Sequence, residues 1–193
     1  MLVAQAVYAS EIFLDTHYAA DITERIYSKI LKKKQNIVLI GMPSCGKSTV
    51  GAILAKRLGK RLVDTDERIV SEAKKPIPDI FSDDGEEAFR DLESSVIANI
   101  SLQNGQIIST GGGAILRKSN IDNLKQNGVL FFIDRSPENL IATSDRPLSS
   151  SKEAVMARYN ERYSIYTSAA DVSVDGNPTP EEVAEKIIGG FYK

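Results

Sequence analysis

The chain lacks several features that mark other classes of protein. It contains one cysteine and one histidine and has no tryptophan. A single cysteine excludes an internal disulfide framework and is typical of a reducing compartment. The lone His17 has no companions that would complete a metal site, so we expect it to be structural or exposed.

Long apolar runs and an excess of one charge are also missing. No apolar run approaches membrane-spanning length, and the N-terminus lacks the basic segment of a signal peptide. The formal net charge is -2, and the basic residues form no long stripe of the kind that binds nucleic acid. We therefore expect a cytoplasmic protein with no membrane or nucleic-acid partner. We further expect a monomer whose partners are small molecules.

One stretch, residues 37–49, carries the strongest chemical signal. An apolar, β-branched run ends at Gly41, and the spacing to Gly46, Lys47 and Ser48 matches the phosphate-binding loop (P-loop) G-x-x-x-x-G-K-[ST]. The glycines let backbone N–H groups converge on a polyphosphate, the lysine reaches its outer phosphates, and the serine hydroxyl binds Mg²⁺. A chance match is disfavoured because a strand pattern precedes the loop and a helical pattern follows it. The sequence predicts that ATP and Mg²⁺ bind here.

The rest of the chain alternates strand and helix patterns. Its 193 residues, 42% of them hydrophobic, can bury a sizeable core in one compact domain. The expected strands lie at residues 37–40, 61–64, 107–109, 129–133 and 172–174. Because parallel strands need crossover connections, this alternation predicts a three-layer α/β/α fold, in which helices cover both faces of a five-stranded parallel sheet.

Residues that follow the strands should meet at one edge of such a sheet, where ligands bind. Asp64 and Asp66 are two positions apart on what we expect to be extended backbone, so both would project to one side, one for the metal and one for a hydroxyl. Residues 111–113 are glycines, which expose bare backbone. Arg90 and Glu93 share one helix face, so the glutamate can hold the guanidinium in place.

Taken together, the motifs resemble the shikimate kinases from Asn36 to the C-terminus. The residues that carry the resemblance are the P-loop, Asp64-Thr65-Asp66, residues 85–93 with Phe-Arg-x-x-Glu, residues 110–113, Arg146-Pro147-Leu148, Glu161-Arg162, Tyr166 and Ala170-Asp171. The resemblance implies a P-loop fold of the nucleoside-monophosphate-kinase-like type. It also implies ATP-dependent phosphorylation of the 3-hydroxyl of shikimate, with Mg²⁺ as cofactor.

The resemblance further implies a role for individual residues. Catalysis would use Lys47, Asp66 as the base, and Arg146 on a lid that closes over the transferring phosphoryl group. ATP would be bound by Gly41, Ser44, Cys45, Gly46, Lys47, Ser48, Thr49 and Arg146. Shikimate would be bound by Asp66, Arg90, Gly111, Gly112, Gly113 and Arg162, with Phe81 and Phe89 walling the pocket. Mg²⁺ would be bound by Ser48 and Asp64.

Plainer interpretations exist for two of these residues. Arg90 could form a surface salt bridge with Glu93, and Asp66 could be the N-cap of a helix that begins at Glu67.

The chain also departs from the family pattern in two places. Leu140 and Ile141 stand where arginines are often found at the start of the lid, and Gly176 stands where many members carry an arginine that stacks on adenine. Two other functions stay open. One is a kinase for another polyol acid such as gluconate, which the paired arginines disfavour. The other is a non-catalytic regulatory or structural domain of a fused dehydrogenase, which rests on the short lid and on the N-terminal segment described next.

Residues 1–35 do not belong to the P-loop unit. An apolar-rich segment at residues 1–14 precedes a second helix with isoleucines at every fourth position, and residues 32–36 form the expected linker. The first segment resembles the closing helix of shikimate dehydrogenases, in which a glutamine at the Gln5 position touches the substrate. The residues that carry this resemblance are Met1-Leu2-Val3-Ala4-Gln5-Ala6, followed by Ala9, Glu11 and Phe13. We thus expect an N-terminal helical extension at 1–35, a remnant of a fused dehydrogenase, and a kinase domain at 36–193. The alternative is a helix packed on the kinase core.

Overall fold

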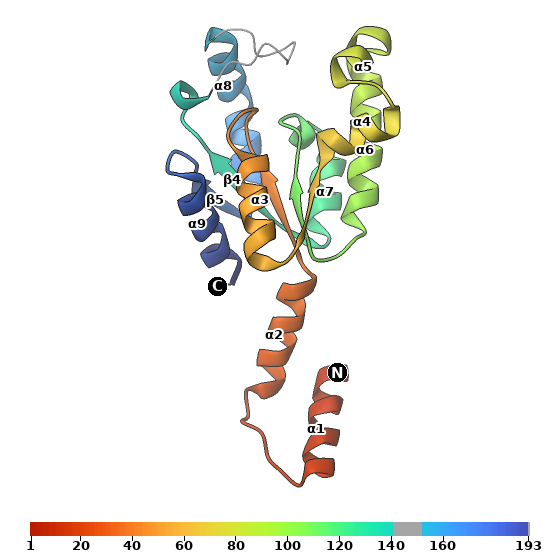
Figure 1. Ribbon diagram of the computed structural model, residues 1–193, viewed down its shortest axis with the longest axis vertical. Coiled ribbons are helices and arrows are strands. Elements are labelled where there is room, and N and C mark those ends of the chain that lie inside the picture. The colour runs from red at the N-terminus through yellow and green to blue at the C-terminus, as the bar shows by residue number, and fades with distance from the viewer. Residues whose placement is uncertain (141–151, 193) are drawn as a thin grey trace.

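A five-stranded parallel sheet lies at the centre of the fold (Figure 1). The computed structural model describes residues 1–140 and 152–192. The sheet has the order β2-β3-β1-β4-β5, with the strands β1 (Asn36–Ile40), β2 (Arg61–Asp64), β3 (Gln106–Ser109), β4 (Gly128–Asp134) and β5 (Val172–Asp175). The predicted parallel sheet is confirmed, and each predicted strand end agrees to within one residue.

Strand β1 is the central and most completely buried element. It pairs with β3 through Ile37 and Ile107 and with β4 through Ile37 and Val129. All its residues are buried, as expected for a run that has strands on both sides and helices above and below. Because β1 is buried on all sides, it holds the start of the P-loop, which follows it, in a fixed position.

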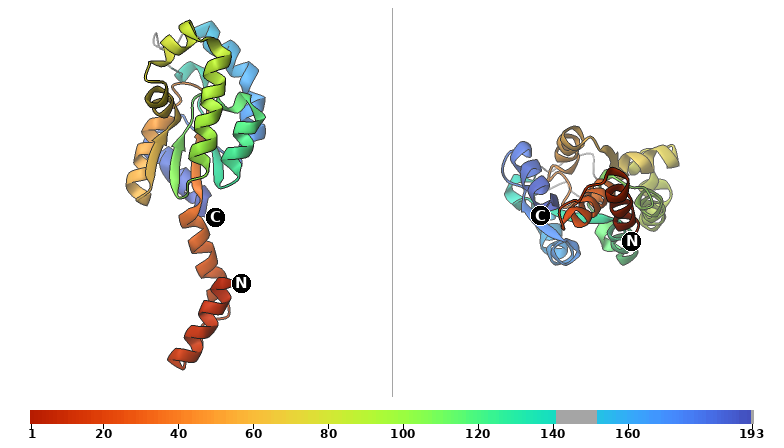
Figure 2. Two further views of the ribbon diagram at one scale, coloured as in Figure 1. Left: turned by 90° about the vertical axis from the view of Figure 1, so that its right-hand side faces the viewer. Right: turned by 90° about the horizontal axis from the view of Figure 1, so that it is seen from below.

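Helices cover both faces of the sheet, which confirms the three-layer architecture. They are α3 (Lys47–Leu58), α4 (Thr65–Ala73), α5 (Ile77–Asp83), α6 (Gly85–Ser101), α7 (Lys118–Lys125), α8 (Lys152–Ala169) and α9 (Pro180–Tyr192), with short 3-10 turns η1 (Ala114–Leu116) and η2 (Pro137–Asn139). Helices α3 and α9 pack together on one face, and α6, α7 and α8 lie on the other side (Figures 1 and 2). Helix α4 and the short α5 stand beside the carboxyl ends of the strands.

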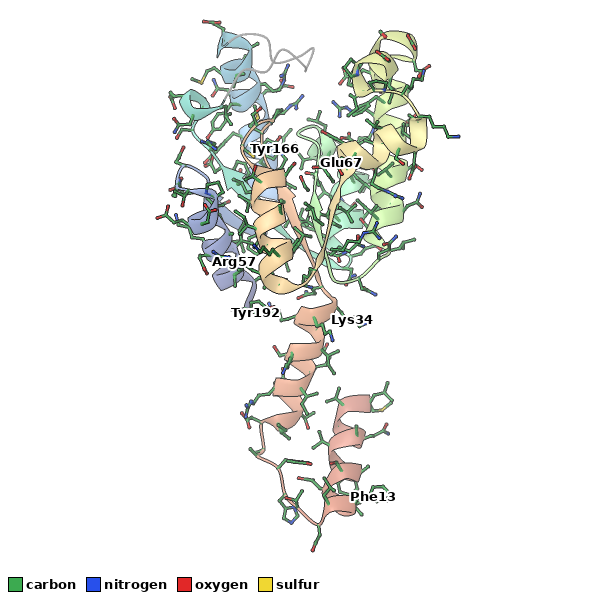
Figure 3. All side chains as sticks on the ribbon, viewed as in Figure 1. Phe13, Lys34, Arg57, Glu67, Tyr166 and Tyr192 are labelled. Atoms are coloured by element: carbon green, nitrogen blue, oxygen red, sulfur yellow. The ribbon has the colours of Figure 1, made fainter. Side chains whose placement is uncertain are left out.

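The N-terminal extension projects away from the sheet as a helical hairpin. It consists of α1 (Leu2–Leu14) and α2 (Ile22–Lys34), and neither helix has a buried residue. Phe13, which is 87% exposed, lies at its far end (Figure 3). The alternative that the first helix packs on the kinase core is therefore wrong. None of the helices in the described ranges is long and apolar enough to cross a membrane.

The predicted linker at residues 32–36 is also wrong. Helix α2 continues to Lys34, and β1 begins at Asn36. The Lys60 ammonium donates hydrogen bonds to the carbonyl oxygens of Lys33 (3.0 Å) and Gln35 (2.9 Å). These bonds satisfy carbonyl groups at the end of α2, so the helix can run up to the sheet without an intervening loop.

Candidate active site

The P-loop connects β1 to α3 at the carboxyl end of the sheet. Gly46 and Ser44 have positive φ angles of 102° and 64°, which turn the loop tightly before the helix. The Lys47 side chain is only 7% exposed, and its ammonium donates to the carbonyl oxygens of Gly41 (2.9 Å) and Met42 (2.8 Å). The lysine charge is therefore held over the loop, as a phosphate-binding role requires.

A cleft of about 450 Å³ opens beside this loop. Its lining residues are Ser44, Gly46, Lys47, Ser48, Thr49, Asp64, Asp66, Glu67, Ser109 and Thr110. Within it, the Ser48 hydroxyl donates to the Asp64 carboxylate at 2.8 Å and lies 3.3 Å from the Ser109 hydroxyl. Two predicted metal ligands are thus neighbours.

The oxygen donors of Ser48 and Asp64 suit Mg²⁺, which is usually held by one or two carboxylates together with substrate phosphates and water. In the part of the chain that the structure describes, no group of three or more His, Cys, Asp or Glu side chains could hold a metal by itself. The donor set therefore fits a Mg²⁺ ion that arrives with a nucleotide.

The structure corrects the expected geometry of the two aspartates. Asp64 ends β2 and is the N-cap of α4, because its carboxylate accepts the Asp66 N–H at 3.0 Å. Asp66 then lies in the first turn of α4, so the two residues are not on one extended strand, and the N-cap interpretation belongs to Asp64. The Asp66 carboxylate oxygen Oδ1 lies 2.6 Å from where a Cβ on Gly111 would stand. It therefore faces the glycine segment as well as the P-loop cleft.

The glycine segment, residues 111–113, contacts several elements at once. The Gly111 N–H donates to the Thr65 hydroxyl at 2.8 Å, and the Gly112 carbonyl accepts from the Tyr166 hydroxyl at 2.5 Å. A Cβ on Gly112 would lie 2.7 Å from the Pro43 ring. The glycine segment thus contacts the P-loop on one side and residues of α4 and α8 on the other.

Arg90 lies directly against this segment. Its guanidinium donates to Glu93 at 2.8 Å and to Glu86 at 3.2 Å, and its central carbon is 2.7 Å from where a Cβ on Gly113 would be. The predicted Arg90 to Glu93 pair exists, but it is buried, with Arg90 8% and Glu93 1% exposed, so the surface salt bridge interpretation is wrong. Burial raises the pKa of Glu93, and the adjacent Arg90 charge partly offsets this rise.

A second buried arginine contacts the adjacent residue of the glycine segment. Arg162, on α8, is 8% exposed and donates to the Gly112 carbonyl at 3.2 Å. Its Nε is buried with no hydrogen-bond partner among the described residues. Because Arg90 contacts Gly113 and Arg162 contacts Gly112, the two guanidinium groups converge on one place. Such a pair suits a carboxylate.

Two predicted aromatic residues line the same region. The rings of Phe81 and Phe89 are 4.6 Å apart, and the Arg90 guanidinium stands 5.1 Å from the centre of the Phe89 ring. These contacts hold the guanidinium between an aromatic face and the glycine segment.

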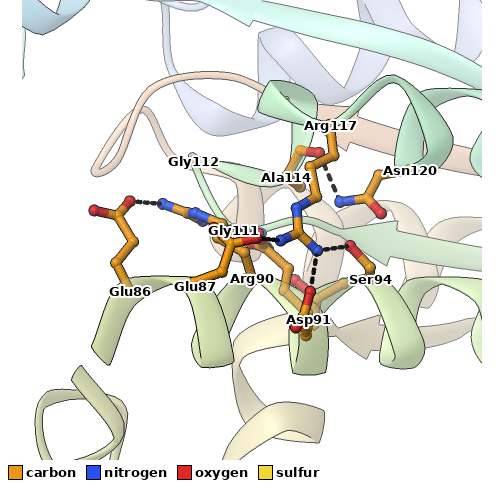
Figure 4. A network of polar contacts seen from close by, with 12 residues as sticks. Glu86, Glu87, Arg90, Asp91, Ser94, Gly111, Gly112, Ala114, Arg117 and Asn120 are labelled. Carbon is orange, nitrogen blue, oxygen red and sulfur yellow. Dashed lines mark hydrogen bonds and ion pairs between the residues drawn. The ribbon is translucent and has the colours of Figure 1, made fainter. Parts of the chain in front are cut away.

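A polar network that no sequence motif indicates connects the residues just after the glycine segment to α6 (Figure 4). Arg117 donates to Asp91 at 2.7 Å and to Ser94 at 3.3 Å, and it also pairs with Glu87. Asn120 donates to the Ala114 carbonyl at 3.0 Å. The network holds the chain just after the glycines beside the helix that carries Arg90. Its members come from two distant segments, so no local pattern could reveal them.

Three residues at or near the predicted lid remain to be placed: Arg146, Ile141 and Leu140. Arg146 and Ile141 lie outside the described residues. Leu140 is 7% exposed and belongs to the core, so this position contributes to packing.

The P-loop lies at the end of the central strand, and two buried arginines contact the glycine segment next to it. This combination defines the class: a P-loop small-molecule kinase of the nucleoside-monophosphate-kinase-like type. The chain belongs to the shikimate kinase family, whose model, described as "Shikimate kinase", matches residues 43–190.

Individual relatives agree with this assignment. The chain is 42% identical over 158 residues to the shikimate kinase of Clostridium botulinum (strain Eklund 17B / Type B), covering 80% of this chain and 95% of that protein. It is 42% identical over 168 residues to the shikimate kinase of Thermodesulfovibrio yellowstonii, covering 82% and 96%. The solved structure of shikimate kinase from Acinetobacter baumannii in complex with shikimate is similar with a TM-score of 0.78 and 30% identity, covering 83% of this chain and 94% of that one.

Proposed function

We propose that this protein transfers the γ-phosphoryl group of ATP to the 3-hydroxyl of shikimate, giving shikimate 3-phosphate and ADP. One observation carries the proposal. The Asp66 side chain both lines the P-loop cleft and lies against the glycine segment that Arg90 and Arg162 contact. A substrate hydroxyl at Asp66 would therefore stand between the phosphate donor and the carboxylate clamp.

Each part of the site has a role in this reaction. Arg90 and Arg162 would bind the shikimate carboxylate, and the backbone of residues 111–113 with Phe81 and Phe89 would shape the pocket. Asp66 would orient the 3-hydroxyl and accept its proton.

On the nucleotide side, Lys47 would neutralise charge that develops on the transferring group, and the P-loop backbone with Ser44, Cys45 and Thr49 would hold the phosphates. Ser48 and Asp64 would hold Mg²⁺, which supplies charge neutralisation on the phosphate oxygens when it is bound. Arg146 would add a further cation from the lid. The catalytic demand is mostly positioning and charge neutralisation.

A coupled assay of ADP release with shikimate, quinate and gluconate as acceptors tests the proposal. We expect ADP release with shikimate above all, and a product whose phosphorus couples to the proton at C3 in its NMR spectrum. Faster turnover with gluconate would favour a kinase for another polyol acid, and no turnover with any acceptor would favour a non-catalytic domain. The relatives named above support neither alternative.

Arg90→Lys is expected to raise the KM for shikimate by about tenfold to a hundredfold, because one point charge replaces a two-donor fork and a charge-assisted hydrogen bond is worth about 1.5–3 kcal/mol. The kcat should change less, since the clamp acts in the ground state and the transition state alike. Arg61→Lys, at an exposed position of β2, is the matched control. An Arg90→Lys enzyme with the wild-type KM for shikimate would exclude the clamp and reopen the choice of substrate.

We also propose that residues 1–35 are an extension without a catalytic role, a remnant of a fused dehydrogenase. The lack of a catalytic role is supported by the absence of buried residues in α1 and α2 and by their position at the amino ends of the strands, opposite the site (Figure 1). The origin from a dehydrogenase rests on the sequence resemblance of residues 1–14 alone. The single buried cysteine, Cys45, supports a reducing compartment such as the cytoplasm. Light scattering during size-exclusion chromatography tests the expected monomer.

Deleting residues 1–20 is expected to leave kcat and both KM values within about twofold of those of the full chain, because surface changes away from a site have small effects. The deletion removes α1 and the turn that follows it, and α2 remains to lead into β1. Steady-state kinetics on both proteins check this. Loss of activity in a soluble deletion protein with an unchanged melting temperature would show that the hairpin is part of the kinase.

A further inference from the structure

Arg135 is a charged residue beside the nucleotide cleft that has no role in the proposed function so far. It directly follows β4, which pairs with β1 through Ile40 and Phe132. Since the P-loop directly follows β1, the parallel pairing brings the residue after β4 to the side of the loop.

The Arg135 guanidinium faces the P-loop itself. Its Nη1 lies 3.9 Å from where a Cβ on Gly46 would stand, and no other described atom outside the immediate chain neighbours lies within 4 Å of that point. Gly46 lines the 450 Å³ cleft together with Lys47 and Ser48. The guanidinium therefore lies beside a residue that lines the cleft, the one that precedes the phosphate-binding lysine.

This cation has no partner of its own in the described part of the chain. Its Nε is buried without a hydrogen-bond partner there, and none of the described ion pairs includes Arg135. The adjacent carboxylate of Asp134 instead accepts hydrogen bonds from the hydroxyls of Tyr159 (2.9 Å) and Tyr163 (3.4 Å). A partly buried cation whose neighbouring carboxylate is occupied favours an anion from outside the chain.

The residue that follows β5 helps to place this side chain. A Cβ on Gly176 would lie 3.4 Å from the Arg135 Cβ and 2.6 Å from Ile133. The loop after β5 therefore packs closely against the base of the Arg135 side chain, whose guanidinium end extends toward Gly46. A planar guanidinium at this position matches phosphate oxygens, which it can bind through two parallel N–H donors.

We propose that Arg135 binds the phosphate chain of the nucleotide together with the P-loop, as a nucleotide-positioning residue. The inference rests on the proposed function in requiring a nucleotide in this cleft. Arg135 would then be a second cation at the phosphates beside Lys47. It comes from the end of β4, whereas Asp64 and Asp66 come from the end of β2, on the other side of β1.

Calorimetric titration of the full chain with ADP and Mg²⁺ tests this without any turnover. Arg135→Gln is expected to weaken ADP binding by about tenfold to a hundredfold, the loss of one charge-assisted contact. Arg135→Lys should recover part of the affinity, because it restores the charge without the fork. Arg61→Gln, which removes an exposed arginine from β2, should bind ADP as the wild type does.

Kinetics separate this role from a structural one. The KM for ATP should rise in Arg135→Gln while the KM for shikimate stays within about twofold, and the melting temperature without ligand should not change. ADP affinity within twofold of wild type in Arg135→Gln, or an equal loss for ADP and shikimate with a lower melting temperature, would overturn the inference and leave the proposed function intact. A wild-type chain that binds no ADP would instead overturn both.

Discussion

In a Lys47→Ala variant, kcat is expected to fall by about 10²- to 10³-fold, the usual cost of removing one charge-stabilising donor from a reaction centre. The variant should still fold. Its Gly41 and Met42 carbonyl groups lose the bonds of 2.9 and 2.8 Å to the ammonium, at a cost of about 1–3 kcal/mol. A domain with about 5–15 kcal/mol of stability tolerates this, with a melting temperature lower by a few degrees.

Lys56→Ala is the matched control, since it removes an exposed ammonium from the same helix α3. Its kcat and melting temperature should both stay close to the wild-type values. Steady-state kinetics and thermal denaturation of the two variants measure the loss of kcat and the change in melting temperature. A folded Lys47→Ala protein with a near-normal kcat would contradict the mechanism in which this lysine stabilises the transferring phosphoryl group.

The second large effect is expected for Asp66→Asn, with kcat lower by roughly 10²-fold or more and a smaller change in the KM for ATP. The amide keeps the shape of the side chain but cannot accept a proton from the substrate hydroxyl. The carboxylate lines the P-loop cleft and faces Gly111, so it is at the boundary of the two halves of the site.

Glu72→Gln provides the control on the same helix α4. Glu72 forms a 3.7 Å ion pair with Arg68 on the surface, and such pairs contribute little. Rapid-quench measurement of phosphoryl transfer on both variants isolates the chemical step from product release. If Asp66→Asn transfers phosphate at the wild-type rate, another group must be the base.

The features that the sequence predicted well are those set by local spacing. The P-loop lies between β1 and α3 as its spacing required, because glycine positions and a buried apolar strand are both local properties. The Arg90 to Glu93 pair follows from helix periodicity. Its burial does not follow from periodicity, since it depends on where α6 packs.

The features that the sequence missed depend on contacts between distant segments. Thr65 holds the Gly111 N–H because β2 pairs with β3 in the register Asp64 to Ser109, which puts the ends of the two strands side by side. The same holds for Arg135, whose proximity to Gly46 arises from the pairing of β4 with β1. Strand order and register are set by the whole core, so a single sequence without an observed sheet could not supply them.

The prediction that Asp64 and Asp66 lie on one extended strand was wrong for a different reason. An Asp-Thr-Asp segment after a strand is compatible both with further extended backbone and with an immediate helix start. The helix begins at once because Asp64 caps it, and this local competition between strand and cap is decided by the packing of α4 on β2 and α6.

The central position of β1 also has a consequence for synthesis of the chain. Its two partners, β3 and β4, are made later, and the last pair, Ile40 with Phe132, closes about ninety residues after β1 has been made. At roughly 5–20 residues per second, at least one edge of the apolar strand stays unpaired for about 5–20 s. Such a segment is an aggregation hazard, and flanking charges oppose it. The lysines at positions 32–34 immediately precede this strand, so we expect the charged end of α2 to oppose aggregation of the nascent strand until its partners are made.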